Sequence, residues 1–164
     1  MSKQSKRMAG LASAASVVAM AGIFSACTPA SPWQSQEEVA AAVRAELRTL
    51  IPRLGTKVTE YDEGLRMCGA ILDGSQNFVY IRLRFTPEDS LMSLMTTGYL
   101  AEKQSQGWTI RTDSTATEPR VVLVAPNGLS FMYEDGRSPS SMADGRGPCL
   151  PKSAGTISSQ GWAG

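Results

Sequence analysis

Three groups of carboxylates are the closest this sequence comes to a catalytic arrangement. One is Glu60, Asp62 and Glu63, and two pairs follow at 88–89 and 134–135. A glycosidase needs two carboxyls from different elements placed across a sugar, whereas each group here is local and falls at a predicted turn or helix start. The group around Asp62 also lacks the spaced oxygen ligands of a calcium loop. We therefore predict no catalytic residue, no metal site and no cofactor.

The absence of histidine narrows the chemistry further. The chain contains none, which excludes Ser-His-Asp and Cys-His catalysis as well as histidine-ligated metals. Serine is plentiful, but neither a G-x-S-x-G elbow nor an S-x-x-K motif occurs. The sequence therefore favours a non-enzymatic protein.

Two arginines and a tyrosine are the candidate ligand-facing residues. In the strand predicted over 77–85, Tyr80, Arg82 and Arg84 share one face, because side chains alternate along a strand. Guanidinium groups and an aromatic ring can recognise an anion or a carbohydrate. The alternative is a solvated sheet face on which these arginines pair with acids of neighbouring strands.

The N-terminus predicts export. A basic start is followed by an uncharged stretch from 8 to 24, which is typical of a secretory signal peptide over 1–26. The residues 24–27, Phe-Ser-Ala-Cys, resemble a bacterial lipobox, which implies lipid attachment and acylation at Cys27. The alternatives are cleavage after Ala30, which would release a soluble protein, and an uncleaved signal anchor. Residues 27–34 then read as a tether.

The net charge of the chain from Cys27 onward limits the kinds of partner that it can bind. From Cys27 onward the chain has 13 basic and 15 acidic residues, a formal charge of −2. A slightly acidic surface predicts no nucleic-acid binding, and without a polybasic patch the cell-membrane anchor must be covalent.

Two cysteines remain once Cys27 is set aside. In an exported protein two remaining cysteines most often form a disulfide, so we expect a bond between Cys68 and Cys149. Two free thiols, or one reactive thiol, are the alternatives.

The first predicted helix begins at Ser35 and ends before Pro52. Ser35 and Glu38 fit a capping box, in which the carboxylate reaches back to the amide of the cap residue. Apolar residues recur at helical spacing, and we expect Arg44 and Arg48 on a solvated helix surface.

The rest of the chain predicts strands and one more helix. A strand is expected over 55–61, then a turn over 62–70, the strand 77–85, a helix over 86–106 and a strand over 107–113. Asn127 and Gly128 predict a hairpin turn between strands at 120–124 and 129–134. We expect a long polar segment over 135–151 and a disordered tail over 151–164, with Trp162 unassigned.

The order α-β-β-α-β-β-β predicts a two-layer α+β domain over 35–150, with both helices on one face of a mainly antiparallel sheet.

The chain from Cys27 onward resembles small lipoproteins of high-GC Gram-positive bacteria (actinobacteria), a family of unknown function. The likeness rests on the lipobox, on "MCG" around Cys68 and on "GPCLP" around Cys149. It implies the location, the disulfide and the fold class. We thus expect a membrane-tethered, extracytoplasmic binding or envelope-structural module that meets an envelope protein or glycan. The alternative is an envelope hydrolase that uses carboxylates not identifiable from sequence.

Overall fold

The computed structural model describes most of the chain after residue 30. The described ranges are 31–54, 57–69, 74–87, 98–113, 119–135 and 141–162. They belong to one compact unit, Ser31–Gly164, and the fold is α+β with a mainly antiparallel sheet of seven strands. The lipobox and Cys27 lie outside the described residues, so the anchor stays a prediction.

Helix α1 (Gln36–Leu50) forms as expected from its sequence. The Ser35 hydroxyl accepts a hydrogen bond from the Glu38 amide at 3.1 Å, and the Glu38 carboxylate accepts one from the Gln34 amide at 2.9 Å. The capping is therefore reciprocal, although the carboxylate reaches one residue further back than expected. A 3-10 turn, Ile51–Leu54, follows the helix.

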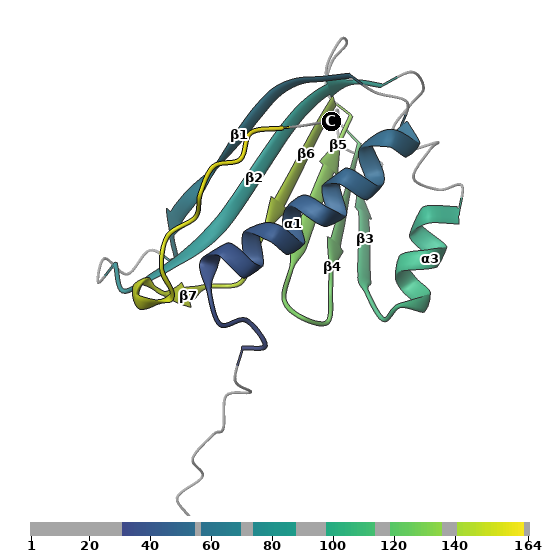
Figure 1. The fold of residues 1–164 in the computed structure, drawn as a ribbon. Helices are drawn as coiled ribbons and strands as arrows, with labels where there is room; N and C mark the ends of the chain where they lie inside the picture. Colours follow the sequence, from purple (N-terminus) through teal and green to yellow (C-terminus); the bar gives the residue numbers. More distant parts are fainter. Residues whose placement is uncertain are drawn as a thin grey trace, which may run out of the picture. The chain divides into compact units, whose positions relative to one another are not determined.

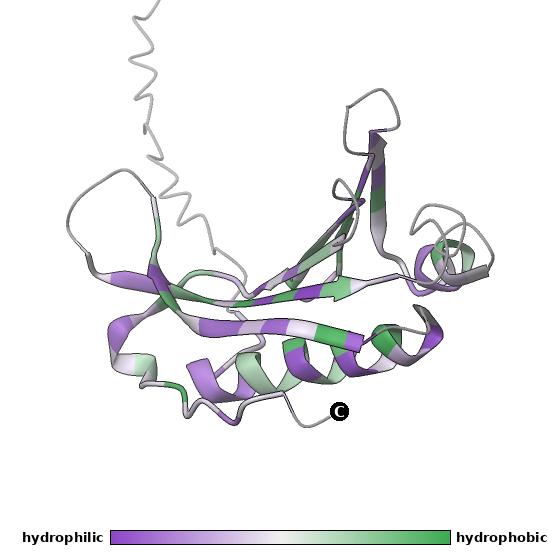
Figure 2. Cartoon of the chain, turned by 90° about the horizontal axis from the view of Figure 1, so that it is seen from above, coloured by the Kyte–Doolittle hydropathy of each residue, from purple (hydrophilic) through white to green (hydrophobic). Residues whose placement is uncertain are grey.

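The sheet runs in the order β1-β2-β6-β5-β4-β3, with β7 paired to β2. The strands are β1 (Lys57–Met67), β2 (Gln76–Thr86), β3 (Thr109–Asp113), β4 (Arg120–Val124), β5 (Ser130–Glu134), β6 (Ser141–Arg146) and β7 (Leu150–Pro151). Helix α1 crosses one face of the sheet (Figure 1) and contacts β2 and β6. Seen from above, α1 lies on one side of β1 and β2 (Figure 2).

Strand β2 confirms the clearest pattern in the sequence. Val79, Ile81, Leu83 and Phe85 are fully buried and face the core with the apolar side of α1. The alternate residues are half-buried or exposed. The hairpin of β4 and β5 is also confirmed, and Gly128 has the positive φ of +86° that its turn requires.

Strand β1 is longer than predicted, and the turn expected over 62–70 is wrong for its first part. The strand continues to Met67 and pairs with β2 from one end to the other, with a register shift between Val58 and Glu60. Gly64 falls inside the expected turn, but it lies opposite Tyr80 in the paired strands, and a ring carbon of Tyr80 would be 3.0 Å from a Cβ at that position. The tyrosine ring covers the glycine, so the strand remains paired there.

The segment over 135–151 is not simply the polar loop that we expected, because it contains β6 and β7. Strand β6 lies between β2 and β5 in the middle of the sheet. A Cβ on Gly145 would lie 2.5 Å from Val43 of α1, and one on Gly147 would lie 2.2 Å from Val39. These glycines let the helix approach the strand closely, whereas the sequence placed them in a long polar segment. The expected element order therefore lacked two strands.

The second predicted helix is described only in part. Helix α3 (Leu100–Ser105) and the turn at Gly107 agree with the end of the predicted helix. Residues 88–97 lie outside the described part of the chain. Helix α3 contacts β3, and the expected packing of both helices on one face of the sheet stays a prediction.

A disulfide joins Cys68, just after β1, to Cys149, just before β7, as predicted. The Cα atoms of the pair are 6.0 Å apart. The bond therefore holds the end of the β1–β2 hairpin against the chain segment that leaves β6.

The C-terminal tail differs from the expected disorder. After a 3-10 turn at Lys152–Ala154, residues 155–162 run on the same side of the sheet as α1 (Figures 1 and 2). Ile157 and Trp162 pack against the core, and Ser158 is hydrogen bonded to α1. We predicted a disordered tail from its polar composition. Its few contacts with the rest of the domain leave no recognisable pattern in the sequence.

Candidate functional site

Strand pairing gathers the candidate residues on the sheet face that is turned away from α1, called the outer face here. Paired residues of an antiparallel sheet point to the same side. Arg82 of β2 pairs with Asp144 of β6, Asp144 with Met132 of β5, and Met132 with Val122 of β4. A row of charged and apolar side chains thus crosses four strands.

Asp144 is the centre of this row. Only 1% of the residue is exposed, and its carboxylate accepts hydrogen bonds at 2.8 Å from Arg82 Nη2 and from Arg146 Nε. Burial opposes ionisation of this carboxyl, but the hydrogen bonds from Arg146 and Arg82 outweigh that effect and lower its pKa. Asp144 in turn raises the pKa of Arg146. The result is a fixed carboxylate that orients two guanidinium groups.

A pocket of about 130 Å³ opens beside this group. Its lining comes from three adjacent strands and consists of Val122, Ser130, Phe131, Met132, Asp144 and Arg146. The side chain of Arg82 is 29% exposed and that of Arg146 is 45% exposed. Neither guanidinium uses its Nη1 group for the bonds to Asp144, and each Nη1 carries two N–H donors. The pocket therefore combines an apolar wall with a positively charged rim.

The other two candidate residues are held by neighbours on β1. The Tyr80 hydroxyl donates to Asp62 at 3.2 Å, and the Arg66 guanidinium lies 4.1 Å from the centre of the Tyr80 ring. Arg84 Nε lies 3.2 Å from Glu60. These contacts agree with the alternative of arginines paired to cross-strand acids, and a role of Tyr80, Arg82 and Arg84 toward a ligand stays a prediction.

The carboxylate group of β1 is divided between the two faces of the sheet. Glu60 and Asp62 lie on the outer face, whereas Glu63 faces α1 and has a fully buried side chain. Among the residues that the structure describes, no group of three or more possible metal ligands occurs. The pair at 88–89 lies outside those residues.

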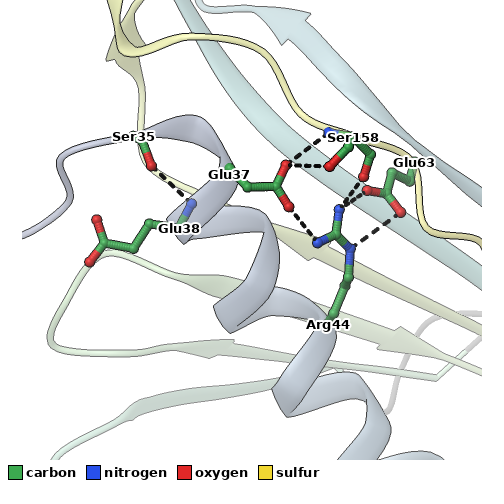
Figure 3. A network of polar contacts seen from close by, with 6 residues as sticks. All are labelled: Ser35, Glu37, Glu38, Arg44, Glu63 and Ser158. Atoms are coloured by element: carbon green, nitrogen blue, oxygen red, sulfur yellow. Dashed lines mark hydrogen bonds and ion pairs between the residues drawn. The ribbon is translucent and has the colours of Figure 1, made fainter.

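The position of Arg44 corrects another expectation. We expected it on a solvated helix surface, but it is 2% exposed and forms ion pairs with Glu63 and Glu37 (Figure 3). Burial alone would lower the pKa of this guanidinium, but the two carboxylates outweigh burial and raise it. Arg48, one turn later, is exposed as expected. Helix periodicity could not tell that Arg44 is buried and Arg48 exposed, because the Glu63 side chain that meets Arg44 comes from a separate strand.

Asp144 and Arg146 were missed because they stand in a glycine-rich, polar stretch. One signal was present: Met142, Asp144 and Arg146 alternate with the small residues Ala143 and Gly145, which is the period of a strand that packs closely under a helix. Proline and glycine around this stretch outweighed that signal.

A comparison of the chain with protein-family models, with curated proteins and with solved structures gave no match. Among the described residues no helix is long and apolar enough to cross a membrane.

Proposed function

We propose that this protein is a lipid-anchored, extracytoplasmic binding module that takes a carboxylate-bearing ligand of the cell envelope in the outer-face pocket. Lipid on Cys27 would hold it to the cell membrane, since several acyl chains give stable anchoring. The proposal is supported by the lipobox-like residues 24–27 and by the disulfide, which is typical of proteins outside the cytoplasm.

The arrangement of Arg82 and Arg146 around Asp144 carries the proposal. A guanidinium that is already oriented loses little side-chain entropy when it binds a ligand, and its planar donors fit a carboxylate. The ionised Asp144 disfavours a dianion such as a phosphate monoester, because the repulsion grows with the ligand's charge. Val122 and Met132 favour a small apolar group next to the bound carboxylate.

An envelope peptide or an acidic glycan could supply this carboxylate.

The alternative, an envelope hydrolase, has less support from this site. The hydrogen bonds to Asp144 lower its pKa, so it stays ionised at neutral pH, and its two arginines occupy the oxygens that a general base would use.

Filling the pocket tests the binding proposal. The variant Val122→Phe places an aromatic ring among the lining residues, and Val124→Phe is the matched control on the same strand and face, 38% exposed and outside the lining. N-acetylalanine and glucuronate serve as probes for a peptide and a glycan source. We expect at least one probe to shift the backbone amide signals of Ser130 and Met132 in a saturable way, with the effect lost only in Val122→Phe.

Two results would contradict the binding proposal. One is that neither probe binds the parent protein. The other is that both phenylalanine variants bind like the parent.

The anchor is tested separately. Changing Cys27 to Ser should move the protein from the membrane fraction to the soluble fraction or leave it as an unprocessed precursor, with a mass that lacks the lipid. An unchanged mass and an unchanged distribution would exclude lipidation at this cysteine.

A further inference from the structure

The C-terminal segment is held at Ser158 through its main chain. The Ser158 amide and hydroxyl donate to Glu37 Oε2 at 2.8 and 3.2 Å, and the Ser158 carbonyl accepts from Arg44 Nη2 at 2.9 Å (Figure 3). Two side chains of α1 thus form hydrogen bonds with the main-chain amide and carbonyl of Ser158. These main-chain contacts do not require serine at this position.

The groups that hold Ser158 are fixed by the domain itself. Arg44 is held from β1 by Glu63, whose Oε2 accepts from Arg44 Nε at 3.4 Å, and from its own helix by Glu37 at 3.0 Å. Neither contact involves the C-terminal segment. Arg44 therefore keeps two partners when the segment is removed, and the Glu37 carboxylate and Arg44 Nη2 lose only their bonds to Ser158.

A second point of contact lies four residues later. The Trp162 ring packs against Tyr61 of β1, with the ring centres 6.0 Å apart, and the Arg48 guanidinium lies 6.0 Å from the Trp162 ring centre. Between these two points, residues 159–161 are exposed. Ile157, next to Ser158, also packs against the core. In the recognition of extended peptides, main-chain hydrogen bonds give affinity and side-chain contacts give specificity.

We infer that Glu37, Arg44, Arg48 and Tyr61 form a binding site for an elongated polypeptide segment, which residues 155–162 fill in this structure. The ligand would be a segment of a partner protein that carries an aromatic residue four positions after the residue bound by Glu37 and Arg44. The chain's own segment competes with that partner. Exposed segments with few contacts open more readily than the rest of a fold, so the partner can take its place.

An exchange experiment tests this inference. A protease recognition sequence inserted between Gly155 and Thr156 lets the full chain fold before it is cut, and the released segment is then removed. A fluorescent peptide with the sequence of residues 156–164 should bind the cut domain in a saturable way. It should bind the uncut chain at least about tenfold more weakly, because a tethered segment competes at a high effective concentration.

Matched variants identify the site. Glu37→Ala should weaken peptide binding about tenfold, the usual effect of losing hydrogen bonds to a charged group. Glu60→Ala removes the same charge from the outer face of β1 and should leave the affinity unchanged. A peptide with alanine in place of Trp162 should bind more weakly than the parent peptide.

Three outcomes would overturn the inference. The cut domain unfolds by circular dichroism, which would make the segment an integral part of the fold. Alternatively, the folded cut domain binds no peptide, or Glu60→Ala weakens binding as much as Glu37→Ala.

Discussion

At the scale of single residues, buried charge is the main feature of this protein. Arg44 and Glu63 are buried on one face of the sheet, and Asp144 is buried on the other beside two partly exposed arginines. A buried charge is tolerated only while its partner is present. The effect of a substitution at these positions on stability should therefore depend mainly on whether a charge is left without its partner, and less on the contact area that is lost.

Removing one partner of the inner pair should be strongly destabilising. We expect Arg44→Met to lower the free energy of unfolding by about 3–5 kcal/mol, because Glu63 is left buried without its cation. The double variant Arg44→Met with Glu63→Leu should recover much of this loss. Urea unfolding of the single and double variants measures both effects, and a double variant as unstable as Arg44→Met would show that the charge is not the cause.

Asp144 should contribute to the acid dependence of stability. Its pKa is lowered in the folded protein, so the folded state gains stability from the ionised form above the ordinary value of about 4. That gain is lost as the pH falls through the lowered pKa. The free energy of unfolding should therefore decrease below about pH 4, and less steeply in Asp144→Asn. Part of the slope remains in this variant because the pKa of Glu37 is also lowered, chiefly by the hydrogen bond from the Ser158 amide. Identical slopes in the two proteins would contradict the assignment.

At the scale of elements, the close contact between α1 and β6 determines the architecture. Gly145 lies against Val43 and Phe131, whose side chains are fully buried in the core. A methyl group there forces the helix and the strand apart. Gly64 is also close to a neighbour, but that neighbour is the half-buried ring of Tyr80, which can shift.

The two glycines should therefore respond differently to alanine. We expect Gly145→Ala to lower the free energy of unfolding by about 2–3 kcal/mol and Gly64→Ala to lower it by less than about 1 kcal/mol. Chemical denaturation of both variants decides the point. Equal losses would mean that the helix does not limit the space at β6.

At the scale of the whole molecule, contacts between segments far apart in the sequence hold the compact unit together. The disulfide joins Cys68 to Cys149, which are 81 residues apart. Trp33 Nε1 donates to the Asn127 carbonyl at 2.8 Å, so the residues before α1 contact the β4–β5 turn. The segment before α1 and the segment before β7 are therefore both fastened to distant parts of the chain.

Loss of the disulfide should destabilise the domain without changing its fold. A bond that closes a loop of this length lowers the entropy of the unfolded chain, and the expected contribution is about 4 kcal/mol. Replacing both cysteines with alanine should lower the free energy of unfolding by about that amount while the far-ultraviolet circular dichroism at 25 °C is retained. A loss below about 1 kcal/mol would contradict the expected effect.

The sequence by itself determined the elements whose signals are local. Ser35 and Glu38 mark the start of α1, the alternation over 77–85 defines β2, and Asn127 with Gly128 defines the hairpin, because capping, alternation and turn geometry depend on near neighbours. The disulfide followed from the number of cysteines and from the expectation that the chain is exported.

Only the tertiary structure decided the rest, because those features depend on partners far away in the sequence. Gly145 was expected in a polar segment, but it lies in β6 against Val43 of α1. Arg44 was expected on a solvated surface, but it is buried beside Glu63 of β1. Asp144 lines a pocket because β6 is paired between β2 and β5, which the sequence did not indicate. The tail was assigned to disorder because its contacts with α1 cross more than 100 residues of sequence. A pattern within one segment carries no information about such a partner, so the candidate site and the path of the C-terminal segment had to come from the fold.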